Sequence, residues 1–231
     1  MDKTKIDNIL IKYNDYEINT LLYKTAIKKD KRTFCQCYNS LLKRRHILIF
    51  IFFTNNDYNS KIIKISLFLF SFSLDYTIHA LFFVDSSIHK IFVNEGNFDF
   101  IYELPKIIYS FLIFKFIYTI IEHLSLSEKN VLEIKYKKQN AFRIVNCLNI
   151  KFVLYFILNF TLLIFFWYYL SCFCAVYKNT QKHLISDTLI GFVISLLSTL
   201  GLCLLPGIFR ILSLKSKNKA LYNFSKFLQF I

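Results

Sequence analysis

The sequence predicts an all-α protein: a polytopic transmembrane helix bundle with about four spans and with amphipathic N- and C-terminal segments. Three observations predict this class: four long apolar segments, an alternating distribution of lysine and arginine between them, and few turn-forming residues. Of the 231 residues, 55% are hydrophobic, whereas soluble domains typically contain about 45–50% apolar residues. The four glycines and two prolines are too few for a β-rich fold with many tight turns.

The four apolar segments comprise residues 62–84, 105–125, 152–177 and 184–209. Each has the roughly 20 residues that a helix needs to cross a bilayer. The third contains no charged residue. Buried helices of soluble proteins rarely hold more than about 14 consecutive apolar residues. The third segment therefore favours a membrane protein, and the other three are interpreted in the same way.

Lysine and arginine are concentrated in alternate connecting segments. Residues 1–46 carry eleven of them, residues 126–151 six and residues 210–231 five, whereas residues 85–104 carry one and residues 178–183 two. Cytoplasmic segments carry such an excess of positive charge. The pattern predicts an integral membrane protein with both termini cytoplasmic, and it leaves open which membrane is involved.

This topology divides the chain into five parts. They are a cytoplasmic or interfacial segment 1–61, a first hairpin 62–125 with the exterior loop 85–104, a basic cytoplasmic loop 126–151, a second hairpin 152–209 and a basic tail 210–231. The apolar stretch 46–53 is too short to span and is interpreted as interfacial, with part of a fifth span as the alternative. Leu221, Phe224, Leu228 and Ile231 recur at helical spacing in the tail.

The net charge of +14 raises the question of a nucleic-acid ligand. A nucleic-acid binder has no reason to alternate its charge between apolar segments, so we exclude that class. The lipid bilayer, and in particular the anionic lipids of the inner leaflet, are the expected partners of the basic segments.

Asp75, His79 and Lys115 are ionisable residues inside the first two spans. Asp75 and His79 are four residues apart and so share one helical face. Asp75 lies nine residues from the outer end of the first span and Lys115 ten from that of the second, so their depths agree within about 2 Å. We predict an Asp75–Lys115 ion pair that allows both segments to insert. The alternative is a proton or cation relay through all three residues.

Small residues recur in the fourth span at Gly191, Ser195 and Ser198. Small side chains at this spacing let helix backbones approach closely. We interpret them as a helix-packing stripe, used within the bundle or for association with a protein partner or a second copy of the chain. Pro206 and Gly207 are expected to kink or end this helix.

No catalytic, cofactor-binding or metal-binding residues are predicted. The sequence lacks a glycine-rich phosphate loop and the motifs of common hydrolases. The Cys-x-Cys pairs 35/37 and 172/174 point about 200° apart on a helix and cannot chelate one ion there. We interpret these cysteines as small hydrophobic residues or palmitoylation targets.

Several stretches resemble a family of uncharacterised multi-pass membrane proteins of single-celled eukaryotes. They are TNNDYNSKIIKI, ALFFVDSSIHKIF, LSLSEKN, SCFCAVYKNTQ and LPGIFR, and the resemblance covers residues 15–214. It implies a shared polytopic fold, in some members as the membrane part of a longer protein, and no activity. The expected function is a non-enzymatic membrane anchor or assembly module. The alternative is a channel or transporter subunit that uses the intramembrane Asp/His/Lys residues.

Overall fold

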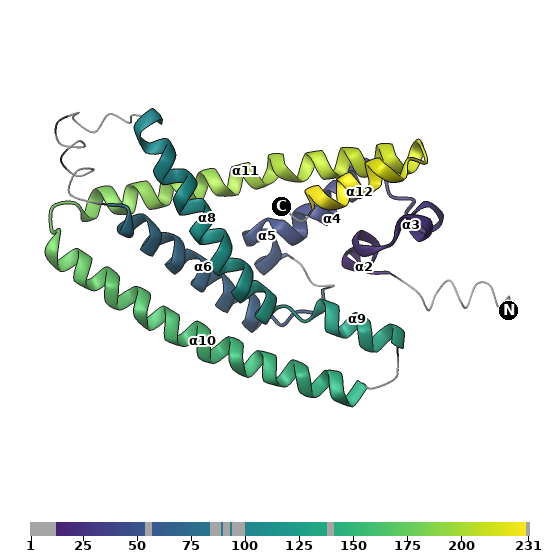
Figure 1. The fold of residues 1–231 in the computed structure, drawn as a ribbon, viewed down its shortest axis with the longest axis horizontal. Coiled ribbons are helices and arrows are strands. Elements are labelled where there is room, and N and C mark those ends of the chain that lie inside the picture. Colours follow the sequence, from purple (N-terminus) through teal and green to yellow (C-terminus); the bar gives the residue numbers. More distant parts are fainter. Residues whose placement is uncertain are drawn as a thin grey trace. The chain divides into compact units, whose positions relative to one another are not determined.

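A computed structural model describes residues 13–53, 57–83, 89, 93, 100–137 and 141–229. The described residues are predominantly α-helical and contain no strand. Figure 1 shows the helices, which comprise α2 (Asp15–Thr20), α3 (Tyr23–Lys29), α4 (Phe34–Arg45), α5 (Ile47–Phe52), α6 (Lys61–Leu81), α8 (Phe100–Ser125), α9 (Glu128–Lys137), α10 (Ala141–Val176), α11 (Gln181–Lys215) and α12 (Lys219–Leu228). The predicted all-α fold class is confirmed.

Four helical ranges are long and apolar enough to cross a membrane: Lys61–Leu81, Ile108–Lys135, Ala141–Val176 and Gln181–Lys215. The second joins most of α8 to α9. Each overlaps one of the predicted spans. The predicted exterior loop, residues 85–104, lies largely outside the described residues, and α8 begins within it at Phe100. α10 has 36 residues and α11 has 35. At 1.5 Å per residue both exceed the roughly 30 Å of a hydrocarbon core.

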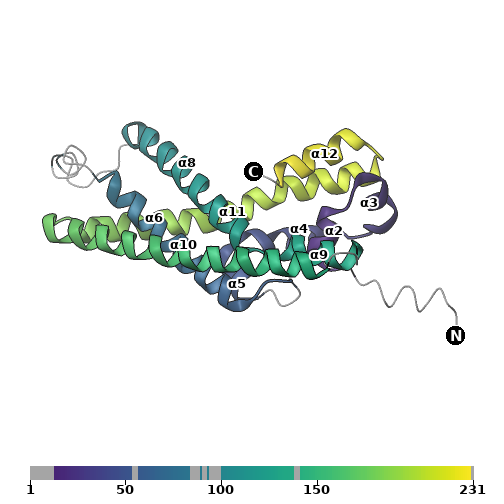
Figure 2. The same ribbon diagram turned by 60° about the horizontal axis from the view of Figure 1, so that its bottom comes forward.

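The chain forms two compact units, and one of them comprises residues 60–194. In this unit α6 packs against α8 and α10, and α10 also contacts α8 and α9. Figure 2 shows α6 beside α10. Half of the span in α6 is buried, compared with 11% of the span in α10. α6 is thus the central helix, because its neighbours bury its aromatic and aliphatic side chains, among them Phe70 and Leu74.

The other unit comprises residues 1–59 and 195–231. It contains the short helices α2 to α5, the second part of α11, and α12. Capping boxes start two of the helices. Asn14 caps α2 through the backbone N–H of Glu17, and Thr33 caps α4 through that of Gln36. Such caps satisfy backbone donors that a helix N-terminus leaves unpaired. The apolar stretch at 46–53 forms α5, a helix of only six residues.

The N-terminal segment consists of separate short helices, among them α2, α3 and α4. The C-terminal segment forms the amphipathic helix α12, which folds back on the end of α11. Phe224 of α12 stacks edge-to-face on Phe209 at 5.0 Å between ring centroids. The Ser225 hydroxyl donates to the Pro206 carbonyl at 2.9 Å. α11 does not end at Pro206, contrary to one of the expected outcomes, and continues to Lys215.

Lys217 makes the turn between α11 and α12 in the left-handed region, at φ 53°. The Asn218 N–H donates to the Ser213 carbonyl at 3.0 Å. This is the hydrogen bond of a Schellman C-cap, in which glycine is the preferred left-handed residue.

Replacing Lys217 with glycine is expected to stabilise this unit by about 0.5–1 kcal/mol, because glycine adopts a positive φ without steric cost. Thermal unfolding in detergent measures the change. Lys219→Gly, at the first position of α12, is the control and should give no stabilisation, because its backbone is already helical. A Lys217→Gly variant that unfolds at a lower temperature contradicts the turn geometry.

Candidate functional site

The predicted intramembrane residues lie on two helices that pack together. Asp75 and His79 share one face of α6, with 3.9 Å between Asp75 Oδ1 and His79 Nε2, and both side chains are about 30% exposed. Lys115 lies on α8 with an exposed side chain, and its backbone carbonyl accepts a hydrogen bond from the Thr119 hydroxyl. α8 contacts α6. The structure thus shows the Asp75–His79 pair, and the Asp75–Lys115 pair stays a prediction.

Gly191 lies against this pair. A Cβ atom at Gly191 would stand 3.1 Å from His79 Nε2. The next residue, Phe192, packs edge-to-face on Phe68 and Phe72 of α6. The absence of a side chain at Gly191 therefore lets this part of α11 approach α6 at the imidazole.

Ser195 and Ser198 lie in the second part of α11 with exposed side chains. The Ser198 hydroxyl donates to the Ser195 carbonyl at 2.9 Å, within the helix. The use of the predicted helix-packing stripe for a partner or a second copy stays a prediction.

The most extensive polar arrangement of the described residues is a buried cluster that the sequence analysis did not identify. We call Asp30, Arg32 and Arg210, with Asn19 and Ser40, the Asp30–Arg210 cluster. The Asp30 carboxylate accepts from Arg210 Nε at 2.8 Å and from Arg32 Nε and Nη2 at 2.8 and 2.9 Å. The side chains of Asp30 and Arg210 are both 0% exposed. Burial of a charge is tolerable only with such pairing.

The remaining donors of the cluster are also used. Arg32 Nη2 donates to Asn19 Oδ1 and Arg32 Nη1 to the Ser40 hydroxyl, both at 3.0 Å. Asn19 Nδ2 donates to the same hydroxyl at 3.0 Å. The cluster therefore joins α2, the linker before α4, and α4 itself. Full satisfaction of a buried polar network favours one rigid arrangement.

Arg210 also binds the C-terminal end of α2. Its Nη2 donates to the Ile18 carbonyl at 2.6 Å, and its Nη1 to the Asn19 carbonyl at 3.0 Å. The last four carbonyls of a helix have no partner within the helix, and they carry the negative end of its dipole. A guanidinium with planar, divergent donors can bind two of them and a carboxylate at once.

α12 supplies partners for the next two carbonyls of the same turn. The Tyr222 hydroxyl donates to the Leu21 carbonyl at 2.8 Å, and Lys226 Nζ donates to the Thr20 carbonyl at 3.1 Å. Four consecutive carbonyls of α2 and its C-cap thus accept from side chains of α11 and α12. The cluster fixes the N-terminal helices to the end of the fourth apolar helix.

The charges around Asp30 determine its pKa. Burial raises the pKa of the carboxyl, but the hydrogen bond from Arg32 and the charges of Arg210 and Arg32 lower it by more in total. The resulting pKa lies below the ordinary value of 3.8. Burial likewise lowers the pKa of Arg32, and the hydrogen bond and charge of Asp30 raise it above its ordinary value.

The lowered pKa of Asp30 predicts that the cluster withstands mild acid. The pKa of such a carboxyl is lower in the folded protein than in the unfolded chain. Its ion pairs contribute their full stability at pH values above the unfolded-state pKa, and this contribution is lost as the pH falls through the folded-state pKa. Hydrogen exchange of residues 14–20 should therefore be equally protected at pH 7 and pH 5, and protection should fall only below about pH 3.8. A loss of protection between pH 7 and pH 5 contradicts the pairing of Asp30.

The sequence contains one signal for this cluster. Asp30 is the only acidic residue in the basic run 28–32, KKDKR, and so it has excess positive charge on both sides. No local pattern assigns it to Arg210, which is 180 residues away. At the sequence level, Arg210 is only the first cationic residue after the fourth apolar segment.

No protein-family model, curated protein or solved structure matches this chain. The resemblance to multi-pass membrane proteins of single-celled eukaryotes stays an expectation.

Proposed function

We propose that the chain is a multi-pass integral membrane protein that serves as a non-enzymatic anchor or assembly module. The single observation that carries this proposal is the binding of Arg210 to Asp30 and to the α2 carbonyls. Arg210 follows directly on an apolar stretch of membrane-spanning length. A helix in the bilayer would therefore hold α2 and the linker that carries Asp30 at its end, beside the membrane surface.

The exposed apolar side chains of α10 and α11 support the membrane location. Only 11% of each span is buried within the protein. Exposed apolar patches larger than a few hundred Å² mark interaction sites or a membrane-facing surface. The exposed apolar side chains on α11 include Leu189, Ile190, Val193, Ile194 and Leu197. Lipid is the proposed partner of most of this surface, and self-association through the fourth span is the proposed use of the remainder.

Membrane extraction and labelling test the proposal. The protein should stay in the membrane pellet after alkaline carbonate treatment. In a cysteine-free background, a cysteine introduced at residue 90 should react with an impermeant maleimide from outside intact cells, and cysteines at residues 140 and 220 should react only after permeabilisation. Labelling at 140 from outside contradicts the topology with cytoplasmic termini.

The second candidate function is a channel or transporter subunit. The Asp75–His79 pair favours it, together with a polar contact in the same bundle, in which Asn159 Nδ2 donates to the Ser66 hydroxyl at 2.8 Å. Ionisable residues at membrane depth commonly mark ion pathways. In reconstituted liposomes the anchor should give no proton or cation flux above that of empty liposomes. A flux that disappears in Asp75→Asn would contradict the anchor and support the channel or transporter subunit.

A pair of charge-removing variants tests the predicted ion pair separately. If Asp75 and Lys115 pair statically, Asp75→Asn should lower the yield of folded protein in detergent, because Lys115 loses its counter-ion at membrane depth. Asp75→Asn with Lys115→Gln should restore it, since neither charge is left alone. Equal yields for the two variants contradict the Asp75–Lys115 pair. Size-exclusion chromatography of the solubilised protein gives the measurement.

A further inference from the structure

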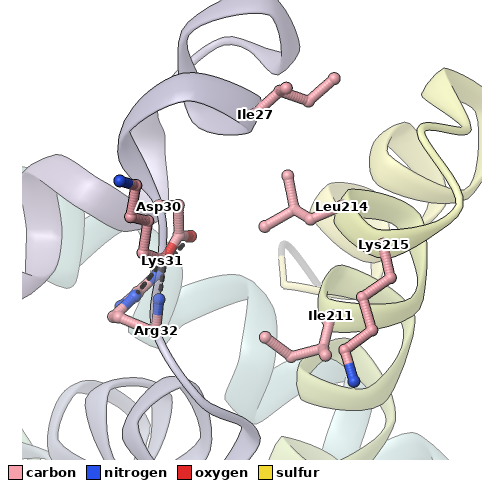
Figure 3. Close-up of a pocket in the computed structure, with 7 residues that line it drawn as sticks. All are labelled: Ile27, Asp30, Lys31, Arg32, Ile211, Leu214 and Lys215. Atoms are coloured by element: carbon pink, nitrogen blue, oxygen red, sulfur yellow. Dashed lines mark hydrogen bonds and ion pairs between the residues drawn. The ribbon is translucent and has the colours of Figure 1, made fainter.

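The pocket drawn in Figure 3, about 220 Å³ in volume, lies beside the Asp30–Arg210 cluster. The ammonium groups of Lys31 and Lys215 point to opposite sides of it, and both side chains are exposed. Asp30 and Arg32 pair with each other, as the dashed lines mark. The charges that line this pocket are thus paired or solvated, and they require no ligand.

In the unit of residues 60–194, by contrast, two buried polar atoms on one face of α10 have no hydrogen-bond partner. Tyr155 and Asn159 are four residues apart, so their side chains project from the same side of the helix. Tyr155 is 0% exposed and Asn159 is 5% exposed. The Tyr155 hydroxyl and Asn159 Oδ1 make no hydrogen bond within the part of the chain that the structure describes. Buried polar groups are normally paired, because an unpaired one loses its hydration without replacement.

Both atoms lie near one side chain of α6, that of Ser66. Asn159 Nδ2 donates to the Ser66 hydroxyl at 2.8 Å. Ser66 also interacts with the Tyr155 hydroxyl, but the two do not meet at hydrogen-bond geometry. Reversal of the Asn159 amide would only leave its nitrogen unpaired in place of its oxygen. The contact between α6 and α10 therefore offers an unused donor, the Tyr155 O–H, and an unused acceptor, Asn159 Oδ1.

These features specify the ligand that the contact can bind. The ligand must be small, because both side chains are almost completely covered by protein. It must be neutral, because Ser66, Tyr155 and Asn159 carry no charge that could compensate a buried ion. It must also accept one hydrogen bond and donate another. A single water molecule meets these conditions, and buried waters typically bind polar groups that the protein leaves unpaired.

We propose that a water molecule is bound between α6 and α10 at Ser66, Tyr155 and Asn159. The water accepts from the Tyr155 hydroxyl and donates to Asn159 Oδ1. Its second hydrogen is directed at Ser66 Oγ, which has a further lone pair. The bridge pairs the buried donors and acceptors of this contact and fixes the register of α10 against α6. The site lies wholly within residues 60–194 and is independent of the proposed anchoring role.

The variant Tyr155→Phe distinguishes a hydrated contact from a dry one by the sign of its effect on stability. It removes only the hydroxyl and keeps the ring. Loss of the bridge should lower the folding equilibrium constant about fivefold in reversible SDS unfolding of the detergent-purified full chain. A buried hydroxyl without a partner would instead destabilise the protein, so its removal would leave this constant unchanged or raise it. Either of these results overturns the bound water.

Tyr168→Phe is the matched control, because it is the same substitution on the same helix at a side chain that is 69% exposed. It should leave the folding equilibrium constant unchanged. An equal loss in Tyr168→Phe and Tyr155→Phe shows that the effect does not come from the buried contact, and it overturns the site.

Radiolytic hydroxyl labelling separates a bound water from a direct Tyr155–Ser66 hydrogen bond, which would give the same loss of stability. Radiolysis generates hydroxyl radicals from bound water as well as from bulk water, and mass spectrometry locates the modified residues. Tyr155 should be labelled several-fold faster than Phe70 of α6, an aromatic residue that is also 0% exposed. Equally slow labelling of the two rings overturns the site.

Asn159→Leu tests the second partner of the water. This variant removes the acceptor and fills its volume with an apolar side chain, so labelling of Tyr155 should fall to the level of Phe70. Undiminished labelling of Tyr155 in Asn159→Leu shows that Asn159 does not hold the water, and it overturns the proposed bridge.

Discussion

Replacement of Arg210 with methionine is expected to release the N-terminal helices from the end of α11, at a cost of about 3–5 kcal/mol. Removal of one partner of a buried ion pair leaves the other charge uncompensated, and this is the usual magnitude of that loss. Arg210 is 0% exposed, and it provides the Asp30 carboxylate with a hydrogen bond at 2.8 Å. Its loss also leaves the Asn19 carbonyl without this donor.

Hydrogen exchange and limited proteolysis in detergent measure this effect. Residues 14–45 should lose protection in Arg210→Met, whereas the helix α6 in the other compact unit should keep it. Lys219→Met is the matched control, because it removes one charge from an exposed position of the same unit. Unchanged protection of residues 14–45 in Arg210→Met would show that the cluster does not hold these helices.

A double substitution separates the ion pair from the capping of α2. Asp30→Asn with Arg210→Met removes both charges, so it should cost less than the sum of the two single changes. The remaining cost reflects the α2 carbonyls that Arg210 leaves without a donor. Strict additivity of the two single changes contradicts direct pairing.

Replacement of Gly191 with leucine is expected to separate α11 from α6 and to destabilise the bundle by about 1–3 kcal/mol, the usual cost of overpacking. The first side-chain atom alone would stand 3.1 Å from His79 Nε2. Gly191→Ala should be nearly neutral, because the gain of about 1 kcal/mol in helix propensity offsets the small shift of the imidazole. Thermal unfolding in detergent gives both values.

Gly201 is the matched control within the same helix. A Cβ atom there would meet nothing within 4 Å among the described residues. Gly201→Leu should therefore be neutral or stabilising, since leucine has a much better helix propensity than glycine. If the leucine variants at 191 and 201 have the same stability, α11 does not pack on α6 at His79.

Local sequence patterns predict part of the helical structure of the two terminal segments. Leu221, Phe224 and Leu228 recur at helical spacing, and these positions lie in α12 (Lys219–Leu228) as the pattern indicates. Residues 14–45 have the capping pairs Asn14–Glu17 and Thr33–Gln36, each a helix start that the sequence shows. Periodicity in this region predicts an amphipathic segment but does not show where its helices begin, and the caps give these boundaries.

Pro206 does not end α11. Proline removes a backbone hydrogen bond and so predicts a kink or an end, yet α11 continues for nine residues to Lys215. Tertiary contacts hold this stretch. Pro206 is fully buried, and Ser225 of α12 donates to its carbonyl. Gly207 lets Phe34 approach, since a Cβ atom there would stand 3.3 Å from the Phe34 ring.

The sequence by itself determined the fold class and the positions of four helices long and apolar enough to cross a membrane. Length and hydropathy are properties of contiguous residues, so they need no knowledge of distant contacts. Only the tertiary structure decided that Asp30 pairs with Arg210 and that Arg210 binds the end of α2. These partners are about 180–190 residues apart, and the pairing of buried charges at such separation depends on the packing of whole helices.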